Sequence, residues 1–495
     1  MKLASDSVDI EGFYTDFHEV LRTSDGIAYR HYKERHSYAE LFEGMQRINS
    51  VLVTRRNQQI VTYVDKTFSA YCAIYGVVLS GNTWIPLNTD MPDARLKEIL
   101  AQTDPSLVLF NTSISDGVRA YLSEENIECL DIRSAIRELD RVDFPGFDFD
   151  KNEIAYIMFT SGSTGTPKGV PMTHENYLNF IGNCQQILEF EKHDVFADYH
   201  EFAFDISIFY LFCCPMVEGA IAPVRNEQDR LLPLSFIQEN GVTVWASVPS
   251  AIALLQTFRP DEVVDSDVRI MFLCGEPFSL GILKYCIANM KVAHVYNFYG
   301  LTETGVENFW HKCRANDVET YEKYGFVPIG LPLDGNRVRV SEDKALHLSG
   351  CQITPGYLGG IGEERFETLD GVRWFNTGDI VEEHEGVYFC KGRVDSQVKV
   401  KGYRIELMDI EVHLRRYEGV EDAVCFVKER GSKNVLVGVI KPRRGFLVDL
   451  QGLRRFLAEH LPAYMGLSRV NVLEDFPVNR NGKIDRARIK EMFTT

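Results

Sequence analysis

Apolar residues along this chain form runs with two different spacings. Short runs rich in Val, Ile and aromatic residues predict buried β-strands at 58–65, 106–111 and 242–248. Longer segments with helical spacing, such as DARLKEILAQ at 93–102, stand between such runs. This alternation is typical of layered α/β folds with largely parallel sheets, and no internal repeat or low-complexity tract interrupts it.

The longest run without a charged residue, 67–89, raises the question of a membrane span. It contains Gly81, Asn82 and Pro86, and so predicts a buried helix followed by a strand.

The N-terminal segment MKLASDSVDIEGF has acidic residues where a signal peptide needs an apolar core. Eleven cysteines without a C-x-x-C pair favour a reducing compartment over a disulfide framework or a zinc site. We expect a cytoplasmic monomer that does not insert into membranes.

Length and charge predict two unequal lobes. A chain of 495 residues with 45% hydrophobic residues is too long for one compact domain to be the default. The net charge of -18 argues against a nucleic-acid or anionic-membrane binder. Residues 396–495 nevertheless carry a local charge of +6, which leaves -24 on residues 1–395. A boundary is therefore expected near residues 391–395, between a large N-terminal lobe and a small C-terminal lobe with a βαβ-like pattern.

The segment IAYIMFTSGSTGTPKGV at 154–170 is the most informative part of the chain. A strand-like apolar run leads into a loop of glycines and hydroxyl residues that ends at Lys168. Glycines permit close backbone approach to an anion, hydroxyls donate hydrogen bonds, and the lysine supplies positive charge. Pro167 stands where a Walker A loop needs its second glycine, so this is a phosphate loop of another kind.

The sequence TSGSTGTPKG resembles the signature loop of the adenylate-forming superfamily, which includes acyl-CoA synthetases, luciferases and amino-acid adenylation domains. Further segments resemble motifs of that family, in the family order: HSYAEL (36–41), NTWIPLN (82–88), FAFDIS (202–207), NFYGLTET (297–304), WFNTGD (374–379), GRVDSQVKVKGYRIEL (392–407), LPAYM (461–465) and NGKIDR (481–486). The resemblance implies a stand-alone enzyme with ATP and Mg²⁺ as cofactors and a fold of two α/β lobes.

The resemblance also assigns the nucleotide site. It places Tyr299 on the adenine, Thr302 near the α-phosphate, Glu303 on Mg²⁺, and Asp379 with Arg393 on the ribose; Lys483 would bridge the substrate carboxylate and the α-phosphate. The implied catalytic residues are Lys483, Thr302 and Glu303. The implied ATP-binding residues are Thr160, Ser161, Gly162, Ser163, Thr164, Gly165, Lys168, Asn297, Tyr299, Thr302, Asp379, Arg393 and Lys483.

In this family the small lobe moves between an adenylating pose and a thioester-forming pose. The matching parts here are a core at 1–392, a hinge at 393–395 that includes Asp395, and a mobile lobe at 396–495. Lys399 to Gly402 would turn toward the thiol in the second pose.

Asp205 aligns with the acid that amino-acid adenylation domains use to bind the substrate ammonium, and a buried carboxylate needs such a partner. The resemblance lines the substrate pocket with Asp205, Ile206, Phe209, Ala246, Phe272, Cys274, Phe298, Val306 and Glu307. Three phenylalanines favour a small amino acid. The segments VWASVPS and FLCGE look most like those of D-alanine ligases that load a D-alanyl carrier protein. Glu307 departs from that pattern and leaves a hydroxyl-bearing or amino-bearing small amino acid open.

The implied reaction forms an aminoacyl-AMP and passes the acyl group to the phosphopantetheine thiol of a carrier protein. No segment of this chain resembles a carrier domain, so the acceptor is expected to be a separate protein. Carrier proteins are typically acidic, and the basic C-terminal lobe offers a docking face. Two alternatives stay open: an acyl-CoA ligase for a non-amino carboxylic acid, and a non-catalytic nucleotide-binding scaffold. A departure from the family is Leu301, which replaces a usual proline.

Overall fold

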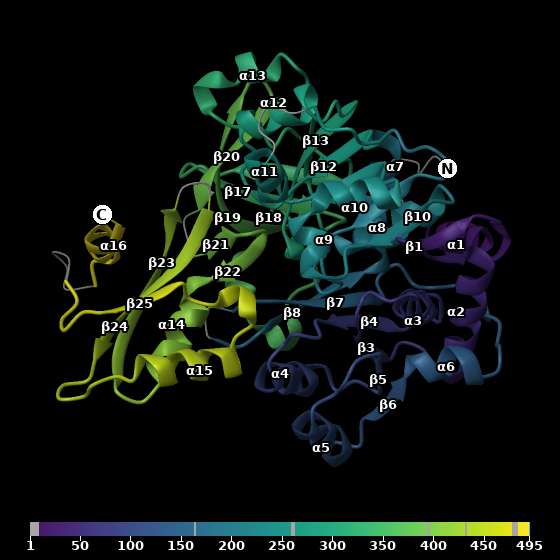
Figure 1. Cartoon of the computed structure of the whole chain (residues 1–495), viewed down its shortest axis with the longest axis horizontal. Coiled ribbons are helices and arrows are strands. Elements are labelled where there is room, and N and C mark those ends of the chain that lie inside the picture. Colours follow the sequence, from purple (N-terminus) through teal and green to yellow (C-terminus); the bar gives the residue numbers. More distant parts are fainter. Residues whose placement is uncertain are drawn as a thin grey trace.

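The computed structural model describes residues 9–162, 165–258, 263–393, 397–430, 433–477 and 484–494. Two large sheets with helices between them form most of the molecule, and a smaller unit lies at the C-terminal end (Figure 1). Among the described residues no helix combines the length and the apolar character needed to span a membrane. The charge-free run at 67–89 instead forms a buried helix followed by a buried strand, as predicted.

The first large sheet carries the predicted phosphate loop at its edge. In spatial order its strands are β6 (Glu128–Asp131), β5 (Leu107–Phe110), β3 (Gln59–Tyr63), β4 (Thr83–Leu87), β7 (Ile154–Thr160) and β8 (Lys168–Thr173). The first five run parallel, and β8 pairs antiparallel with β7. The loop between β7 and β8 therefore connects a hairpin at the edge of a parallel sheet.

The second large sheet provides strand ends for the rest of the site. In spatial order its strands are β15 (Leu331–Pro332), β14 (Phe309–Lys312), β13 (His294–Tyr299), β12 (Ile270–Leu273), β11 (Val244–Ser247), β9 (Val195–Asp198), β10 (Ala220–Pro223), β1 (Ile27–His31) and β2 (Glu34–Ser37). The six strands from β13 to β1 run parallel, and the outer strands are antiparallel.

Helices fill the space between the two sheets and cover their outer faces. The inner helices are α1 (Ile10–Thr23), α2 (Tyr38–Leu52), α3 (Phe68–Leu79), α6 (Ile132–Glu138), α7 (His174–Ile187) and α8 (Ser207–Met216). The outer helices are α4 (Asp93–Thr103) and α5 (Asp116–Glu124) on the first sheet, and α10 (Pro233–Asn240), α11 (Pro249–Phe258), α12 (Leu280–Ala288) and α13 (Asp317–Thr320) on the second, with α9 (Glu227–Leu231) ahead of α10.

The strands of the second sheet are apolar on both faces because both faces are covered. In β12, Ile270 and Phe272 face the inner helices, whereas Met271 and Leu273 face the outer ones. Side chains alternate between the faces of a strand, so strands of a doubly covered sheet are continuous apolar runs. This explains why such strands are visible in the sequence.

A third sheet completes the large lobe. It is built from β16 (Asn336–Val340), β17 (Ala345–Gly350), β18 (Phe366–Leu369), β19 (Val372–His384) and β20 (Val387–Arg393), all antiparallel. Short 3₁₀ turns in the chain are η1 (Thr302–Thr304), η2 (Glu322–Tyr324), η3 (Leu358–Gly360), η4 (Glu363–Arg365) and η5 (Ala463–Met465).

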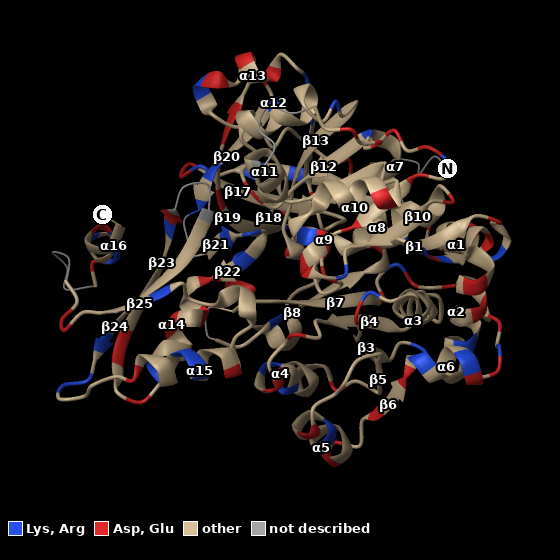
Figure 2. Cartoon of the chain, in the orientation of Figure 1, with Lys and Arg blue, Asp and Glu red and all other residues tan. Residues whose placement is uncertain are grey.

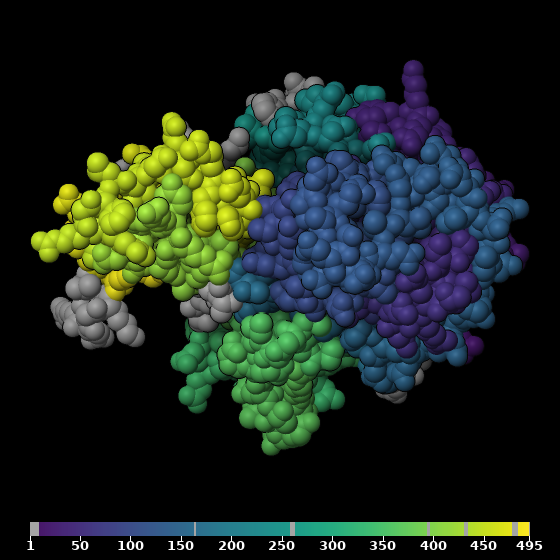
Figure 3. Space-filling view, turned by 90° about the horizontal axis from the view of Figure 1, so that it is seen from below, coloured from purple at the N-terminus to yellow at the C-terminus, as the bar shows by residue number. Residues whose placement is uncertain are grey.

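The residues from 397 onward have hydrophobic cores of their own. They form the hairpin β21 (Gln397–Val400) and β22 (Tyr403–Glu406), then α14 (Leu407–Arg416), β23 (Val420–Arg430), β24 (Lys433–Pro442), α15 (Leu450–His460), β25 (Arg469–Val472) and α16 (Arg486–Thr494). Figure 3 shows this unit as a separate mass that touches the rest of the molecule along one side. The predicted α/β fold with a large and a small lobe is confirmed; the exact division at 392 and 395 stays a prediction.

Candidate active site

The loop between β7 and β8 is shaped by its glycines. Thr160 ends β7 and Lys168 begins β8, so both lie at the base of the loop. A Cβ on Gly162 would lie 2.1 Å from the Thr166 carbonyl oxygen, and Gly165 has a left-handed φ of +85°. Both positions therefore exclude larger side chains, as expected for a loop that folds tightly around an anion.

The hairpin β21–β22 of the small lobe lies against this loop. The Glu406 backbone N–H donates to Ser161 Oγ at 3.0 Å, and Ser161 Oγ donates to the Arg404 carbonyl at 3.4 Å. Lys168 Nζ lies 5.5 Å from the centre of the Tyr357 ring, a cation–π distance. Phosphate loop and hairpin thus share one site.

Glu303, the predicted Mg²⁺ ligand, is buried in η1 with both carboxylate oxygens bonded. Tyr357 Oη donates to Oε1 at 2.8 Å and Arg404 Nη1 donates to Oε2 at 2.6 Å. Burial alone would raise the pKa of Glu303, but the Arg404 guanidinium outweighs it and lowers that pKa to about 2. A permanently charged carboxylate suits a hard divalent cation, so Glu303 fits the predicted role; in this pose a guanidinium neutralises it.

Asp379, the predicted ribose ligand, sits at a sheet position where two partners hold it. Tyr299 Oη donates to Oδ2 at 2.5 Å, and Arg393 Nη1 donates to Oδ1 at 2.8 Å. The structure thus brings these three predicted nucleotide residues together at the end of β13 and the β19–β20 pair. Asn297, also predicted for ATP binding, donates its amide to the Pro328 carbonyl at 2.8 Å and supports that neighbouring segment.

Asp205 lies just before α8, close to the two predicted catalytic residues of η1. Burial raises its pKa, a hydrogen bond from Thr302 lowers it, and the charge of Glu303 raises it again. The net shift is upward, so Asp205 is a carboxylate that a nearby cation would stabilise in its charged form. Thr302 is therefore a hydrogen-bond partner of Asp205, the predicted ligand of the substrate ammonium.

The predicted pocket walls are all buried and come from α8 and the residue directly before it, from the neighbouring strands β11, β12 and β13 of the second sheet, and from the turns that follow those strands. They are Ile206, Phe209, Ala246, Phe272, Cys274, Phe298, Val306 and Glu307. The Phe272 ring centre lies 4.7 Å from that of Phe209 and stacks on Phe298 at 4.0 Å. The aromatic rings predicted to line the substrate pocket are thus packed against one another.

Glu307 is an acid within this apolar wall. Burial, then the charge of Asp205, raises the pKa of Glu307 to about 8, against an opposing hydrogen bond with Cys274. Burial also raises the pKa of the Cys274 thiol, with Glu307 adding to the effect. The pocket therefore contains two carboxylates that destabilise each other's charged form.

The small lobe makes contacts that the sequence did not reveal. The Gly402 N–H donates to Glu276 Oε1 at 2.6 Å, and a Cβ on Gly402 would lie 2.6 Å from Val248 Cγ1. Gly402 has a left-handed φ of +83°, so glycine is needed there both for conformation and for close approach. The motif GYRIEL was visible in the sequence, but nothing local indicated which residues of the large lobe it would meet.

A buried ion pair joins the two lobes beside the phosphate loop. Arg95 of α4 donates to Asp409 of α14 at 3.1 Å and to the Gly165 carbonyl at 2.9 Å. Both charged side chains are at most 5% exposed. Arg95, Asp409, Arg404 and Tyr357 are the residues of this site that sequence reasoning missed.

Four predicted residues lie outside the described residues: Ser163, Thr164, Asp395 and Lys483. The described neighbours of Lys483 are informative by themselves. Phe476 and Ile484 pack with α16 on one face of the C-terminal sheet, whereas α14 and α15 cover the other face. The hairpin and α14 face the large lobe, so the small lobe presents its α14 side to the site.

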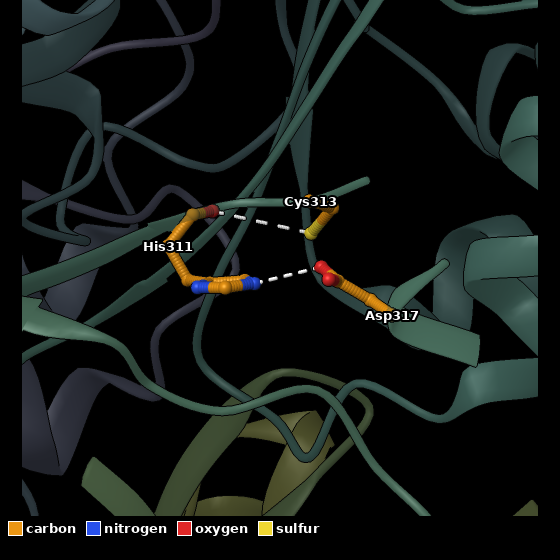
Figure 4. A group of neighbouring side chains, drawn as sticks. All are labelled: His311, Cys313 and Asp317. Carbon is orange, nitrogen blue, oxygen red and sulfur yellow. Dashed lines mark hydrogen bonds and ion pairs between the residues drawn. The ribbon is translucent and has the colours of Figure 1, made fainter. Parts of the chain in front are cut away.

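A second group of chemically interesting side chains lies elsewhere, on β14, directly after it and at the start of α13 (Figure 4). His311, Cys313 and Asp317 could together hold a metal ion. His311 Nε2 pairs with Asp317 Oδ2 at 2.8 Å, and the same oxygen accepts the Arg314 backbone N–H at 2.9 Å. These bonds stabilise the turn before α13. The group therefore has a structural explanation and is not part of the candidate active site.

Comparison with known proteins identifies a family model and relatives that match this chain. A family model described as "AMP-binding enzyme" matches residues 17–358. The chain is 28% identical over 487 residues to the D-alanine–D-alanyl carrier protein ligase of Staphylococcus epidermidis, covering 96% of this chain and 98% of that protein. Identity to the enzyme of the same name from Staphylococcus haemolyticus is 27% over 495 residues, with 98% and 99% covered.

Solved structures share the fold. The adenylation domain AlmE of Vibrio cholerae, solved with glycyl-adenosine-5'-phosphate, superposes with a TM-score of 0.82 and covers 99% of both chains. The sequence identity of 22% means that this likeness speaks for the fold alone.

Proposed function

We propose that this chain, which belongs to the family of AMP-binding enzymes, is a ligase that activates a small amino acid and loads it on a separate carrier protein. A carboxylate oxygen of the amino acid attacks the α-phosphorus of ATP, and pyrophosphate leaves. The carrier's phosphopantetheine thiolate then attacks the carbonyl carbon of the aminoacyl-AMP, and AMP leaves. The observation that carries the proposal is the convergence of the phosphate loop, Glu303, Asp379 and Asp205 on one site.

The nucleotide would lie between the phosphate loop and the third sheet. Lys168 supplies charge to the phosphates, Asp379 accepts from the ribose hydroxyls, and the Tyr299 ring packs against the adenine. Glu303 would hold Mg²⁺, which supplies positive charge to the triphosphate when it is bound. Asp205 would then accept the α-ammonium of the amino acid, which leaves the substrate carboxylate directed toward Thr302 and the α-phosphate.

The arrangement of the small lobe supports the thioester-forming pose. Arg404 pairs with Glu303, and Gly402 is in contact with Val248 at the edge of the pocket. The described residues that flank Lys483 pack on the opposite face of the small lobe. We infer that rotation about 393–395, with Asp395 as its hinge, exchanges this hairpin for Lys483 between the two steps.

The carrier protein would dock on the small lobe. Figure 2 shows Lys and Arg on α15, where Arg454 and Arg455 are exposed. Such a surface suits an acidic partner. The names of the relatives, which are ligases of a carrier protein, support a carrier as the acceptor. We expect the enzyme to act as a monomer in the cytoplasm.

The test is ATP–pyrophosphate exchange with D- and L-amino acids, benzoate and short fatty acids, for the wild type and Asp205→Asn. Strong exchange with one small amino acid, lost about a hundredfold or more in the variant, supports the proposal. Exchange with a non-amino acid that survives in the variant assigns the chain to the acyl-CoA ligases. Absence of exchange with every acid would identify a non-catalytic nucleotide-binding scaffold.

A further inference from the structure

We propose that Glu307 binds a second ammonium group, and that the substrate class is a short-chain diamino acid such as 2,3-diaminopropionate or 2,4-diaminobutyrate. The inference rests on the proposed function and specifies the substrate of the same site. It starts from a carboxylate oxygen for which the described part of the chain provides no partner.

Glu307 Oε2 is buried and accepts no hydrogen bond from any described residue. The side chain is only 4% exposed, so solvent does not satisfy it either. A buried polar atom without a partner destabilises a protein. Of the twelve such side-chain atoms among the described residues, Glu307 Oε2 is the one that belongs to the predicted substrate pocket. The partner of Glu307 Oε2 is therefore expected to arrive with the substrate.

The backbone conformation directly before Glu307 has an energetic cost. Val306, directly before it, has a φ of +75°, which is strained for a β-branched residue. Gln352 Nε2 donates to the Glu307 carbonyl at 2.8 Å, and a Cβ on Gly300 would lie 2.3 Å from the Glu307 Cα. Contacts to the backbone thus fix the position of Glu307 within the apolar wall.

Two cations would be needed to hold both carboxylates of the pocket, Asp205 and Glu307, in their charged forms. Asp205 and Glu307 raise each other's energy when both are charged, and the Cys274 thiol is the neutral group beside Glu307. The charge of Lys399 on β21 also acts on Glu307 and lowers its pKa, but it does not outweigh burial and the charge of Asp205. An amino acid with one ammonium group neutralises one of these two carboxylates. A diamino acid neutralises both, and its own carboxylate takes part in the reaction.

Size limits the length of that diamino acid. Phe272 stacks on Phe298 and packs on Phe209, so the three aromatic residues predicted to line the pocket are closely packed. A glutamate side chain is long enough to reach toward the substrate, and a short substrate side chain is then sufficient to meet it. A neutral methyl group, as in alanine, would leave Glu307 Oε2 without a partner.

The experiment compares ATP–pyrophosphate exchange of the wild type and Glu307→Gln with both enantiomers of 2,3-diaminopropionate, 2,4-diaminobutyrate, serine and alanine. The amide preserves the shape of the side chain and removes its charge. We expect the wild type to prefer a diamino acid, and the kcat/KM ratio of that diamino acid to alanine to fall about a hundredfold in the variant. A parallel Asp205→Asn variant is expected to lose exchange with every substrate.

The outcomes separate the two proposals. Wild-type exchange that favours alanine or serine, with a ratio unchanged in Glu307→Gln, overturns the diamino acid while the proposed function stands. Exchange with no amino acid at all overturns both. Thermal unfolding of each variant shows whether a loss of activity is a loss of folded protein.

Discussion

Replacing Arg404 by alanine should separate the two half-reactions. Arg404 donates to Glu303 at 2.6 Å, and the two side chains are 15% and 3% exposed. Breaking a buried ion pair from one side costs about 3–5 kcal/mol because it leaves an unpaired charge. That cost applies to the thioester-forming pose, in which Arg404 pairs with Glu303. In the adenylating pose, Mg²⁺ would neutralise the charge of Glu303 instead. Each 1.4 kcal/mol changes an equilibrium constant tenfold. Even the lower figure of about 3 kcal/mol would therefore reduce the population of the pose with the Arg404–Glu303 pair about a hundredfold.

The assay measures both steps on the same preparation. ATP–pyrophosphate exchange reports adenylation, and mass spectrometry of the aminoacyl thioester formed with free pantetheine reports transfer. We expect the ratio of the transfer rate to the exchange rate to fall about a hundredfold in Arg404→Ala and to recover in part in Arg404→Lys, which keeps the charge without the planar fork. Arg488→Ala, at a side chain that is 63% exposed on α16, is the matched control. An equal fall of both rates, or no change in either, would refute the reasoning.

Three further predictions follow from the same site. The pKa of Glu307 is raised from 4.5 to about 8, so the stability linked to its proton is present below pH 4.5 and is lost as the pH rises through 8. Relative to Glu307→Gln, the wild type should therefore lose at most about 5 kcal/mol of unfolding free energy across this window, measured by urea denaturation; a constant gap between the two proteins contradicts the shift. Reversing Arg454 and Arg455 to glutamate should slow loading of an acidic carrier protein while sparing transfer to free pantetheine, and equal loss of both would exclude α15 as the docking face. Lys483→Ala should lower exchange more than a hundredfold but leave preformed aminoacyl-AMP reactive with pantetheine; unchanged exchange would place the lysine outside the adenylation step.

The sequence predicted the fold class and the family because local sequence patterns and motifs indicate both. The strands predicted at 58–65, 106–111 and 242–248 are observed as β3, β5 and β11, and the helix at 93–102 is α4. Each is an apolar run covered on both faces or an amphipathic helix, and such patterns depend on neighbours in sequence. The roles assigned to single residues, including Lys483 and Asp395, stay predictions.

The pocket residues were also proposed from the sequence, since Asp205 and Phe272 lie within recognisable motifs and Glu307 follows one closely; their role as the pocket stays a prediction. What the sequence could not show is that Glu307 Oε2 has no described partner, or that strain at Val306 helps to position it. Both depend on backbone angles and on packing between segments that are distant in the chain.

The sequence by itself determined which elements form, in which order, and which chemical groups stand at the ends of the strands. Only the tertiary structure decided which of those groups meet: Arg404 with Glu303, which is 101 positions earlier, and Arg95 with Asp409, which is 314 positions away. The physical reason is that periodicity and turn chemistry act over a few residues, whereas these pairs form because the small lobe lies against the phosphate loop. The position of that lobe follows from the sum of its contacts, which no local pattern records.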